Sequence, residues 1–362
     1  MKYILSGGGT GGHIYPALAI ANELKSRDIN NKILYVGKKG SLEEELVKKA
    51  GFDFAPIHCE GLPRKALNKQ SITSVIELLK GLIDSKKIIK KFKPDVVIGT
   101  GGYVCAPIVY QAQRCGVKTV VQEQNAYPGK TNRLLAKKAD LVAINFEEAR
   151  KYLVSDNIFY TGNPIRNEFK SVDKKLSAEK TGLKLSDKNV LSFGGSGGQE
   201  STNEAIIEIL KSGRDIDFNL IHITGKPHYD YVMEKLTDVE IPENVKILDY
   251  SHEIPDLLKV VDLVIASSSA MTLAEISAMG LASILIPKDY TAGNHQVFNA
   301  NSYKEKNAAE VILEKDLNGD LLYNKIEELL NNDSIREKMG NNAKKLGNLD
   351  AVKNIADMIE DL

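Results

Sequence analysis

Two glycine-rich segments, each lying between a short apolar run and an amphipathic run, constrain the fold of this 362-residue chain most strongly. The first reads SGGGTGGHIYPALAIANEL over residues 6–24, and the second reads FGGSGGQESTNEAI over residues 193–206. A strand, a tight glycine turn and a helix in this order are typical of the start of a βαβ unit. Because the arrangement occurs twice, we predict two similar α/β domains.

The rest of the chain follows the same alternation. Apolar runs such as KYIL, KILYVG, DVVIGTGG, KTVVQE and DLVAI alternate with helix-length segments that we expect at 16–27, 41–50, 104–115 and 129–138. The alternation pauses at TGNPIRNEF, residues 161–169, and restarts at residue 190. We predict two doubly wound parallel-sheet domains facing each other across a cleft. They comprise residues 1–163, joined by a C-terminal helix within 346–362, and residues 164–345.

Composition excludes several classes of protein. The chain has 48 basic and 48 acidic residues, so no global charge favours nucleic acid, and we expect no nucleic-acid partner. Three cysteines without CxxC spacing predict neither a disulfide framework nor a zinc knuckle and favour a reduced, cytosolic setting. We find no signal-peptide pattern and no apolar run near the ~20 residues that span a bilayer. Any membrane association is therefore expected to be peripheral.

The first glycine loop has two familiar alternatives. It satisfies GxGxxG, but a dinucleotide site requires an acidic residue about 20 positions later, where Lys38 and Lys39 stand. A phosphate-binding P-loop requires a lysine where His13 stands. We expect Pro16 to start a helix whose free N–H groups attract negative charge. His13 is a candidate general base near neutral pH, and the alternative is a histidine that only caps the loop.

We predict no metal site and no cofactor. Asp215 and Asp217 have the DxD spacing of metal-dependent sugar transferases, but they precede the apolar run FNLIHITG. That position is at the amino end of a strand, whereas ligands bind at the carboxyl ends. We interpret the pair as a solvated turn. The six histidines show no HExxH pairing.

Seven motifs in order resemble the MurG family of peptidoglycan glycosyltransferases, a member group of glycosyltransferase family 28. They are GGGTGGHIYPALAIA, GTGGYVCAPI, QEQNAYPGKTNRLLA, TGNPIR, FGGSGGQ, SSSAMTLAEI and TAGNHQVFNA, and they span residues 7–300. The resemblance implies a GT-B fold and inverting transfer of N-acetylglucosamine from UDP-N-acetylglucosamine to undecaprenyl-pyrophosphoryl-N-acetylmuramyl-pentapeptide, without an essential metal. The acceptor is implied for the first domain and the donor for the second.

The resemblance also implies donor-binding residues. Those carried over from the motifs are Thr10, Gly11, Gly12, Asn125, Arg166, Ser196, Ile254, Glu275, His295 and Gln296. Within this set, Arg166 and Ser196 are implied to meet the diphosphate, Ile254 the uracil and Glu275 the ribose hydroxyls. Independently, Ala270, Met271 and Thr272 follow an apolar run and begin a helix, so their N–H groups are expected to stabilise the leaving diphosphate.

The sequence departs from the family pattern in the second half of the chain. Ser269 and Gly293 stand where the family usually has a glycine and an acidic residue, respectively. GGSGGQE also replaces the more usual GGSLGA. Ser269 adds a side chain beside the expected diphosphate site.

The acceptor side has its own candidates. We expect backbone N–H groups near Gly101, Gly102, Tyr103 and Gln124 to hold the acceptor's pyrophosphate. Residues 74–95 combine apolar residues with six lysines, which is typical of an ordinary core-packed helix with a solvated basic face. A lipid-linked anionic acceptor raises the alternative of contact with an anionic membrane surface, extended by Arg64 and Lys65. We therefore expect a peripheral enzyme at the cytoplasmic face of the cell membrane.

Three rival functions remain. A UDP-N-acetylglucosamine 2-epimerase shares the two-domain fold but is expected to have more acid–base side chains in its cleft. A related glycolipid glycosyltransferase would differ in its acceptor motifs, and EQNAYPGKTN argues against it. A non-catalytic UDP-sugar-binding or membrane-recruiting subunit is disfavoured because both half-sites lie on one chain.

Overall fold

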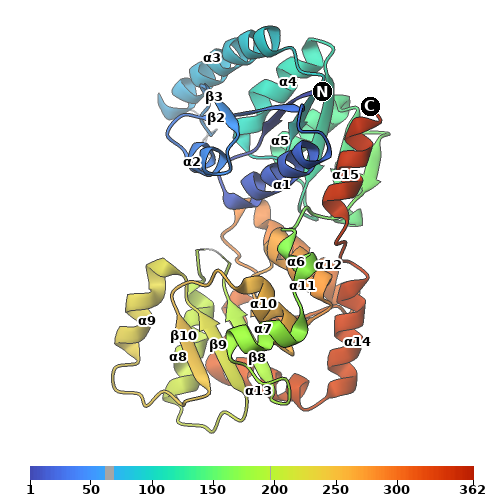
Figure 1. The fold of residues 1–362 in the computed structure, drawn as a ribbon. Helices are drawn as coiled ribbons and strands as arrows, with labels where there is room; N and C mark the ends of the chain where they lie inside the picture. Colours follow the sequence, from blue (N-terminus) through green and yellow to red (C-terminus); the bar gives the residue numbers. More distant parts are fainter. Residues whose placement is uncertain (62–68, 196) are drawn as a thin grey trace. The chain divides into compact units, whose positions relative to one another are not determined.

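The computed structural model describes residues 1–61, 69–195 and 197–362. These residues form two compact units. Unit 1 comprises Met1–Ile165 and Asp350–Leu362, and unit 2 comprises Arg166–Leu349. Each unit is built on one parallel sheet (Figure 1).

Unit 1 has a seven-stranded sheet in the order β3-β2-β1-β4-β5-β6-β7, with every described pair parallel. Its strands are β1 Lys2–Ser6, β2 Lys32–Lys38, β3 Asp53–Ile57, β4 Val96–Gly99, β5 Lys118–Glu123, β6 Leu141–Ile144 and β7 Ile158–Tyr160. Strands β4 and β6 are buried at every residue. Because adjacent residues of a strand point to opposite faces, this burial requires helices on both faces of the sheet.

The helices of unit 1 supply that cover. They are α1 Gly11–Arg27, α2 Leu42–Lys49, α3 Lys69–Phe92, α4 Ala106–Arg114, α5 Lys130–Leu135 and α15 Ala351–Glu360, with short 3₁₀ turns at Tyr103–Cys105, Ala136–Lys138 and Glu147–Tyr152. One buried cluster joins β1 and β4 to α1 and α15, and another joins the opposite faces of these strands to α3, α4 and α5.

The C-terminal helix α15 is part of the core of unit 1. Val352, Ile355 and Ile359 are at most 3% exposed. Burying a side chain of this size contributes about 1.5–3 kcal/mol. Arg27 of α1 also bonds the carboxylates of Asp357 and Glu360, each at 2.7 Å, so α15 is held by both packing and charge.

Unit 2 has a six-stranded parallel sheet in the order β10-β9-β8-β11-β12-β13. Its strands are β8 Asn189–Phe193, β9 Asn219–Ile223, β10 Val245–Leu248, β11 Leu263–Ala266, β12 Ala282–Leu285 and β13 Glu310–Val311. Its helices are α6 Glu168–Ser171, α7 Lys174–Thr181, α8 Glu200–Lys211, α9 Tyr229–Lys235, α10 Ile254–Val260, α11 Ala270–Met279, α12 His295–Glu305, α13 Gly319–Leu330 and α14 Asp333–Lys344, with 3₁₀ turns at Lys226–His228, Ala292–Asn294 and Glu314–Asp316.

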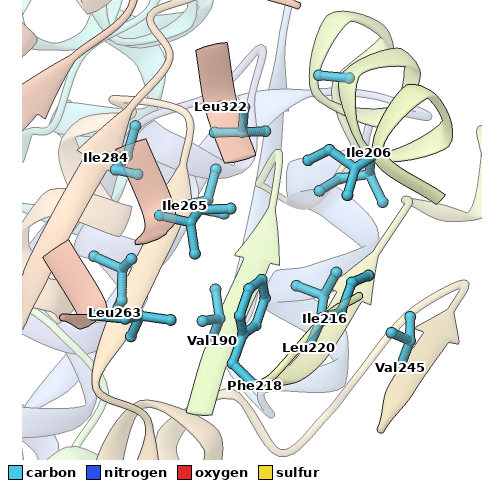
Figure 2. Packing of buried hydrophobic residues seen from close by; sticks show 14 of the residues in the cluster. Val190, Ile206, Ile216, Phe218, Leu220, Val245, Leu263, Ile265, Ile284 and Leu322 are labelled. Atoms are coloured by element: carbon cyan, nitrogen blue, oxygen red, sulfur yellow. The ribbon is translucent and has the colours of Figure 1, made fainter. Parts of the chain in front are cut away.

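Figure 2 shows the core of unit 2, in which side chains of successive strands meet those of the covering helices. Val190, Leu263 and Ile284 project from neighbouring strands, and Ile206 of α8 and Leu322 of α13 pack against the same cluster. The predicted pair of doubly wound parallel sheets is confirmed. No helix in the described part of the chain is long and apolar enough to cross a membrane.

Candidate active site

The glycine loop of unit 1 lies at the carboxyl end of β1, against the loop that follows β4. Gly7 and Gly8 are buried, and the Gly8 N–H donates to the Gly101 carbonyl at 3.3 Å. A Cβ atom at Gly102 would lie 2.2 Å from the Gly8 carbonyl oxygen, and Gly102 has a φ of +80°. Only glycine allows this approach, so the two loops form one surface.

Helix α1 begins at Gly11, earlier than we expected. Thr10 is the N-cap residue, with extended backbone angles, and its carbonyl accepts from the His13 and Ile14 N–H groups at 3.1 and 3.3 Å. The expectation that Pro16 starts this helix is wrong, because Pro16 lies inside α1. Gly11, Gly12 and His13 therefore belong to the first turn.

His13 is held by the glycine loop. Its Nδ1 atom lies 3.1 Å from the Gly8 carbonyl oxygen and 3.3 Å from Thr10 Oγ1. Since a carbonyl only accepts, a bond to Gly8 requires the proton on Nδ1, which leaves the lone pair of the neutral ring on Nε2. The Thr100 hydroxyl donates to the His13 carbonyl at 2.6 Å and fixes the backbone beneath the ring.

The acceptor candidates occupy the neighbouring loops. Gly101 has a φ of +108°, and a Cβ atom there would lie 2.7 Å from the His13 ring. Tyr103 begins the 3₁₀ turn after β4, is 36% exposed, and lies beside Gly9. Gln124 is only 2% exposed and donates to the Thr100 carbonyl at 2.6 Å, so its side chain supports the loop from below.

Asn125 is positioned by a buried carboxylate that the sequence analysis did not single out. Glu123, at the end of β5, is 1% exposed and accepts from the Asn125 N–H at 2.9 Å and from its side-chain amide at 3.2 Å. It also accepts from the Gly129 N–H at 3.1 Å and from the Asn132 amide at 2.9 Å. Burial raises the pKa of Glu123, and these four hydrogen bonds oppose that rise.

In unit 2, the second glycine loop follows β8. Ser196, implied to meet the diphosphate, lies outside the described residues, as do Arg64 and Lys65. A Cβ atom at Gly198, whose φ is +73°, would lie 2.0 Å from the Thr224 carbonyl oxygen after β9. A Cβ atom at Gly195 would lie 3.5 Å from Ser267 Oγ, at the end of β11. The loop is thus packed against both neighbouring strands.

Helix α11 begins at Ala270, and Ala270, Met271 and Thr272 form its first turn. Ser269, a departure from the family pattern, is its N-cap residue. The Ser269 Oγ accepts from the Thr272 N–H at 3.3 Å and donates to Thr272 Oγ1 at 2.8 Å. One of the three N–H groups expected to face a diphosphate is therefore already satisfied by the protein.

Arg166 and Glu275 were expected to contact different parts of the donor, and the structure pairs them. Arg166 Nη2 lies 3.6 Å from Glu275 Oε1, and their side chains are 42% and 15% exposed, respectively. Burial raises the pKa of Glu275 to about 7, and Arg166 partly offsets this rise. Glu275 therefore changes protonation near neutral pH.

Ile254 begins α10 and is followed by Pro255, which favours a helix start. Asp256, in the same turn, accepts from Ser177 Oγ at 2.8 Å and pairs with Lys180, both on α7. Burial alone would raise the pKa of Asp256, but Lys180 and the Ser177 hydroxyl together outweigh it and lower that pKa. These contacts fix the start of α10 on α7.

His295 and Gln296 begin α12, after Asn294 in the left-handed region at φ 53°. Gln296 is 6% exposed, and its Oε1 accepts from the Lys288 N–H at 3.1 Å. Gly293, the other departure from the family pattern, has a φ of +67°, a conformation that an acidic residue would adopt only with strain.

Family sequence models match most of the chain. The glycosyltransferase family 28 N-terminal domain matches residues 3–144, and the glycosyltransferase family 28 C-terminal domain matches residues 189–357. The chain belongs to glycosyltransferase family 28. Both family domains contain one of the glycine loops described above.

Relatives of this chain match it over nearly their whole length. One relative is the UDP-N-acetylglucosamine–N-acetylmuramyl-(pentapeptide) pyrophosphoryl-undecaprenol N-acetylglucosamine transferase of Finegoldia magna. The two chains are 44% identical over 99% of this chain and 97% of that relative. This chain is 43% identical, over the full length of both chains, to the transferase of the same name from Thermoanaerobacter sp.. The crystal structure of Acinetobacter baumannii MurG, 23% identical, superposes with a TM-score of 0.79 over 100% of this chain and 99% of that one. The expected GT-B fold is confirmed by this likeness.

Several side chains that support the two glycine loops were not predicted from the sequence. Glu43 of α2 is 2% exposed, and its carboxylate would contact a Cβ atom at Gly8. Glu314 accepts from Gln199 at 2.8 Å and from Ser201 at 2.7 Å. Only Glu123 had a signal in the sequence, as an acidic residue at the carboxyl end of an apolar strand. Among the described residues, no group of three or more His, Cys, Asp or Glu side chains could hold a metal ion.

Proposed function

We propose that this protein transfers N-acetylglucosamine from UDP-N-acetylglucosamine to the C4 hydroxyl of undecaprenyl-pyrophosphoryl-N-acetylmuramyl-pentapeptide. The observation that carries this proposal is the 43–44% identity, over nearly the whole chain, to transferases named for that reaction. The two glycine loops at carboxyl ends of parallel strands support it, because ligands of such sheets bind there.

On the donor side, we assign the nucleotide to unit 2. Ala270 and Met271 begin the ten-residue helix α11, and their N–H groups suit the diphosphate. The Glu275 carboxylate suits the ribose diol. Ile254 is assigned to the uracil, Asn125, His295 and Gln296 to the sugar, and Arg166 and Ser196 to the diphosphate. Thr10, Gly11 and Gly12 complete the assignment from unit 1.

On the acceptor side, we assign proton removal to His13. The C4 hydroxyl oxygen attacks the anomeric carbon from the face opposite UDP, its proton passes to His13 Nε2, and the bond to the UDP oxygen breaks. The Nδ1 contact to Gly8 supports this role because it leaves Nε2 as the basic atom. We assign the acceptor's pyrophosphate to Gly101, Gly102, Tyr103 and the loop supported by Gln124.

Helix α3 is the proposed membrane contact of a peripheral enzyme at the cytoplasmic face. Val75, Ile76, Leu79 and Ile83 are 47–57% exposed and recur on one side of the helix. Exposed lysines follow at 86, 87, 90 and 91. Apolar side chains beside lysines suit an anionic lipid surface, at about 1 kcal/mol per lysine.

Sedimentation with vesicles tests the membrane assignment. Full-length protein should bind phosphatidylglycerol vesicles more tightly than phosphatidylcholine vesicles, and L79S should weaken binding. I29S is the matched control, because Ile29 is 74% exposed but lies outside α3. Equal binding to both vesicle types would contradict the electrostatic part of the assignment, and equal loss in both variants would contradict the role of α3.

A radiolabel assay tests the proposed reaction. Label from UDP-N-acetylglucosamine should enter the lipid phase only when the lipid-linked muramyl acceptor is present. A glycolipid transferase of another specificity would label a different lipid, and a non-catalytic subunit would label none. Either result would contradict the proposal.

A further inference from the structure

Lys288 extends from the carboxyl end of β12 to the glycine loop of unit 2. We propose that its ammonium group binds the diphosphate of the donor nucleotide as a second cation beside Arg166. This inference rests on the proposed function, because it takes a nucleoside diphosphate as the ligand of unit 2.

The backbone around Lys288 is fixed on all sides. The Lys288 N–H donates to Gln296 Oε1 at 3.1 Å, and the Lys288 carbonyl accepts from the Thr291 hydroxyl at 3.1 Å. The next N–H, of Asp289, donates to Glu314 Oε2 at 3.0 Å. The side chain therefore leaves a rigid support, which reduces the conformational entropy lost when its ammonium group binds a ligand.

The ammonium group itself is half-buried and reaches the loop. Its Nζ atom donates to the Gly198 carbonyl at 2.6 Å. An ammonium group has three N–H donors, so this bond uses one of them. Burial lowers the pKa of Lys288, whereas the charge of Glu314 raises it.

The nearby carboxylate does not neutralise Lys288 by direct contact. Glu314 Oε1 accepts from Gln199 and Ser201, and Oε2 accepts from the Asp289 N–H. Among the described residues, no carboxylate oxygen lies within 4.0 Å of the Lys288 Nζ. A desolvated cation without a contacting anion is stabilised when an anionic ligand arrives.

Lys288 lies at the edge of the sheet to which we assign the donor's phosphates. Strands β8 and β12 flank β11, so their carboxyl ends and the start of α11 lie along one edge of the sheet. Gly195 of the loop after β8 lies next to Ser267, just before α11. The proposal therefore places the anion on this loop and on the first turn of α11, at the edge of the sheet where the Lys288 ammonium group meets the Gly198 carbonyl.

The proposal predicts an effect that depends on phosphate. Losing a charged hydrogen bond weakens binding about tenfold to a hundredfold. K288M should therefore weaken UDP binding by this factor and leave uridine binding within about twofold, because uridine has no phosphate. K288R should retain most of the affinity for UDP.

Calorimetric titration of the full-length protein with uridine, UMP and UDP tests the inference. The matched control is K188M, because Lys188 precedes β8 at the opposite edge of the sheet and pairs with Asp217. The expected result is a loss confined to phosphate-bearing ligands in K288M alone. Unchanged UDP affinity in K288M would overturn the inference, as would an equal loss for uridine and UDP, which would assign Lys288 to loop structure only.

These outcomes are distinct from failure of the proposed function. Wild-type protein that bound none of the three ligands would overturn the donor assignment itself and the inference with it. Wild-type binding of UDP with an unaffected K288M variant would leave the donor assignment intact and overturn only the role of Lys288.

Discussion

Replacing Arg166 by methionine should raise the pH at which unit 2 loses affinity for uridine. The pKa of the Glu275 carboxyl is about 7, raised by burial and partly offset by Arg166. The ionised carboxylate accepts hydrogen bonds from a ribose diol about twice as strongly as the neutral acid does. Affinity for uridine should therefore fall as the pH drops through 7 in the wild-type protein.

The size of the shift follows from the distance between the two charges. At 3.6 Å, the pair interacts by about 1 kcal/mol in bulk water and by about 4–5 kcal/mol at an effective dielectric constant of 20. Because Arg166 is 42% exposed, screening favours the lower value, roughly 1–2 kcal/mol. Since one pKa unit corresponds to about 1.4 kcal/mol, the pKa of Glu275 in R166M should be roughly one unit higher.

Calorimetric titration with uridine between about pH 5.5 and 8.5 measures this shift. Uridine is used because any contact of Arg166 with phosphate then has no effect. E275Q should remove the pH dependence. An unchanged midpoint in R166M, or a midpoint that persists in E275Q, would refute the coupling of Arg166 and Glu275.

Four further predictions concern single residues. H13A should lower kcat about a hundredfold or more in the lipid transfer assay, whereas an increase in KM alone would make His13 a binding residue. Burial lowers the pKa of His222 to about 4, so the unfolded state binds its proton first as the pH falls. The difference in unfolding free energy between wild type and H222Q, measured by urea denaturation, should narrow by about 3 kcal/mol from pH 6.5 to 4, and a constant difference would contradict this. S269G should lower the free energy of unfolding by only a few tenths of a kcal/mol. It should bind UDP at least as tightly as the wild type, because it frees the Thr272 N–H, and weaker binding would indicate that the Ser269 hydroxyl contacts the ligand. E123Q should destabilise unit 1 by about 1–3 kcal/mol in the same denaturation assay and lower kcat/KM, because its amide N–H₂ faces N–H donors, and unchanged values would contradict the positioning role.

The sheets and glycine loops were predictable because they depend on local pattern. Short apolar runs followed by glycine and an amphipathic segment predict a strand, a turn and a helix. The same logic failed for the start of α1. Proline favours the first turn, which pointed to Pro16. Instead the Thr10 carbonyl accepts the first helical hydrogen bonds and Thr100 fixes the His13 carbonyl, so the helix begins at Gly11.

The side chains that support the site could not be predicted from the sequence, for a different reason. Glu43 and Lys288 act on Gly8 and Gly198, residues that are 35 and 90 positions away along the chain. Such contacts arise only when the strands are assembled in their final order. The side chains that were predicted, such as His13 and Glu275, lie within one or two turns of a glycine loop or a helix start.

A transferase moves the sugar to an acceptor, whereas an epimerase rearranges the sugar on its nucleotide. The most direct measurement is an NMR determination of the product formed from ¹³C-labelled UDP-N-acetylglucosamine and the lipid-linked muramyl acceptor. We expect labelled N-acetylglucosamine in β linkage to C4 of the muramyl residue, with one UDP released per link. Epimerised UDP-sugar formed without acceptor, or an α linkage, would contradict this expectation.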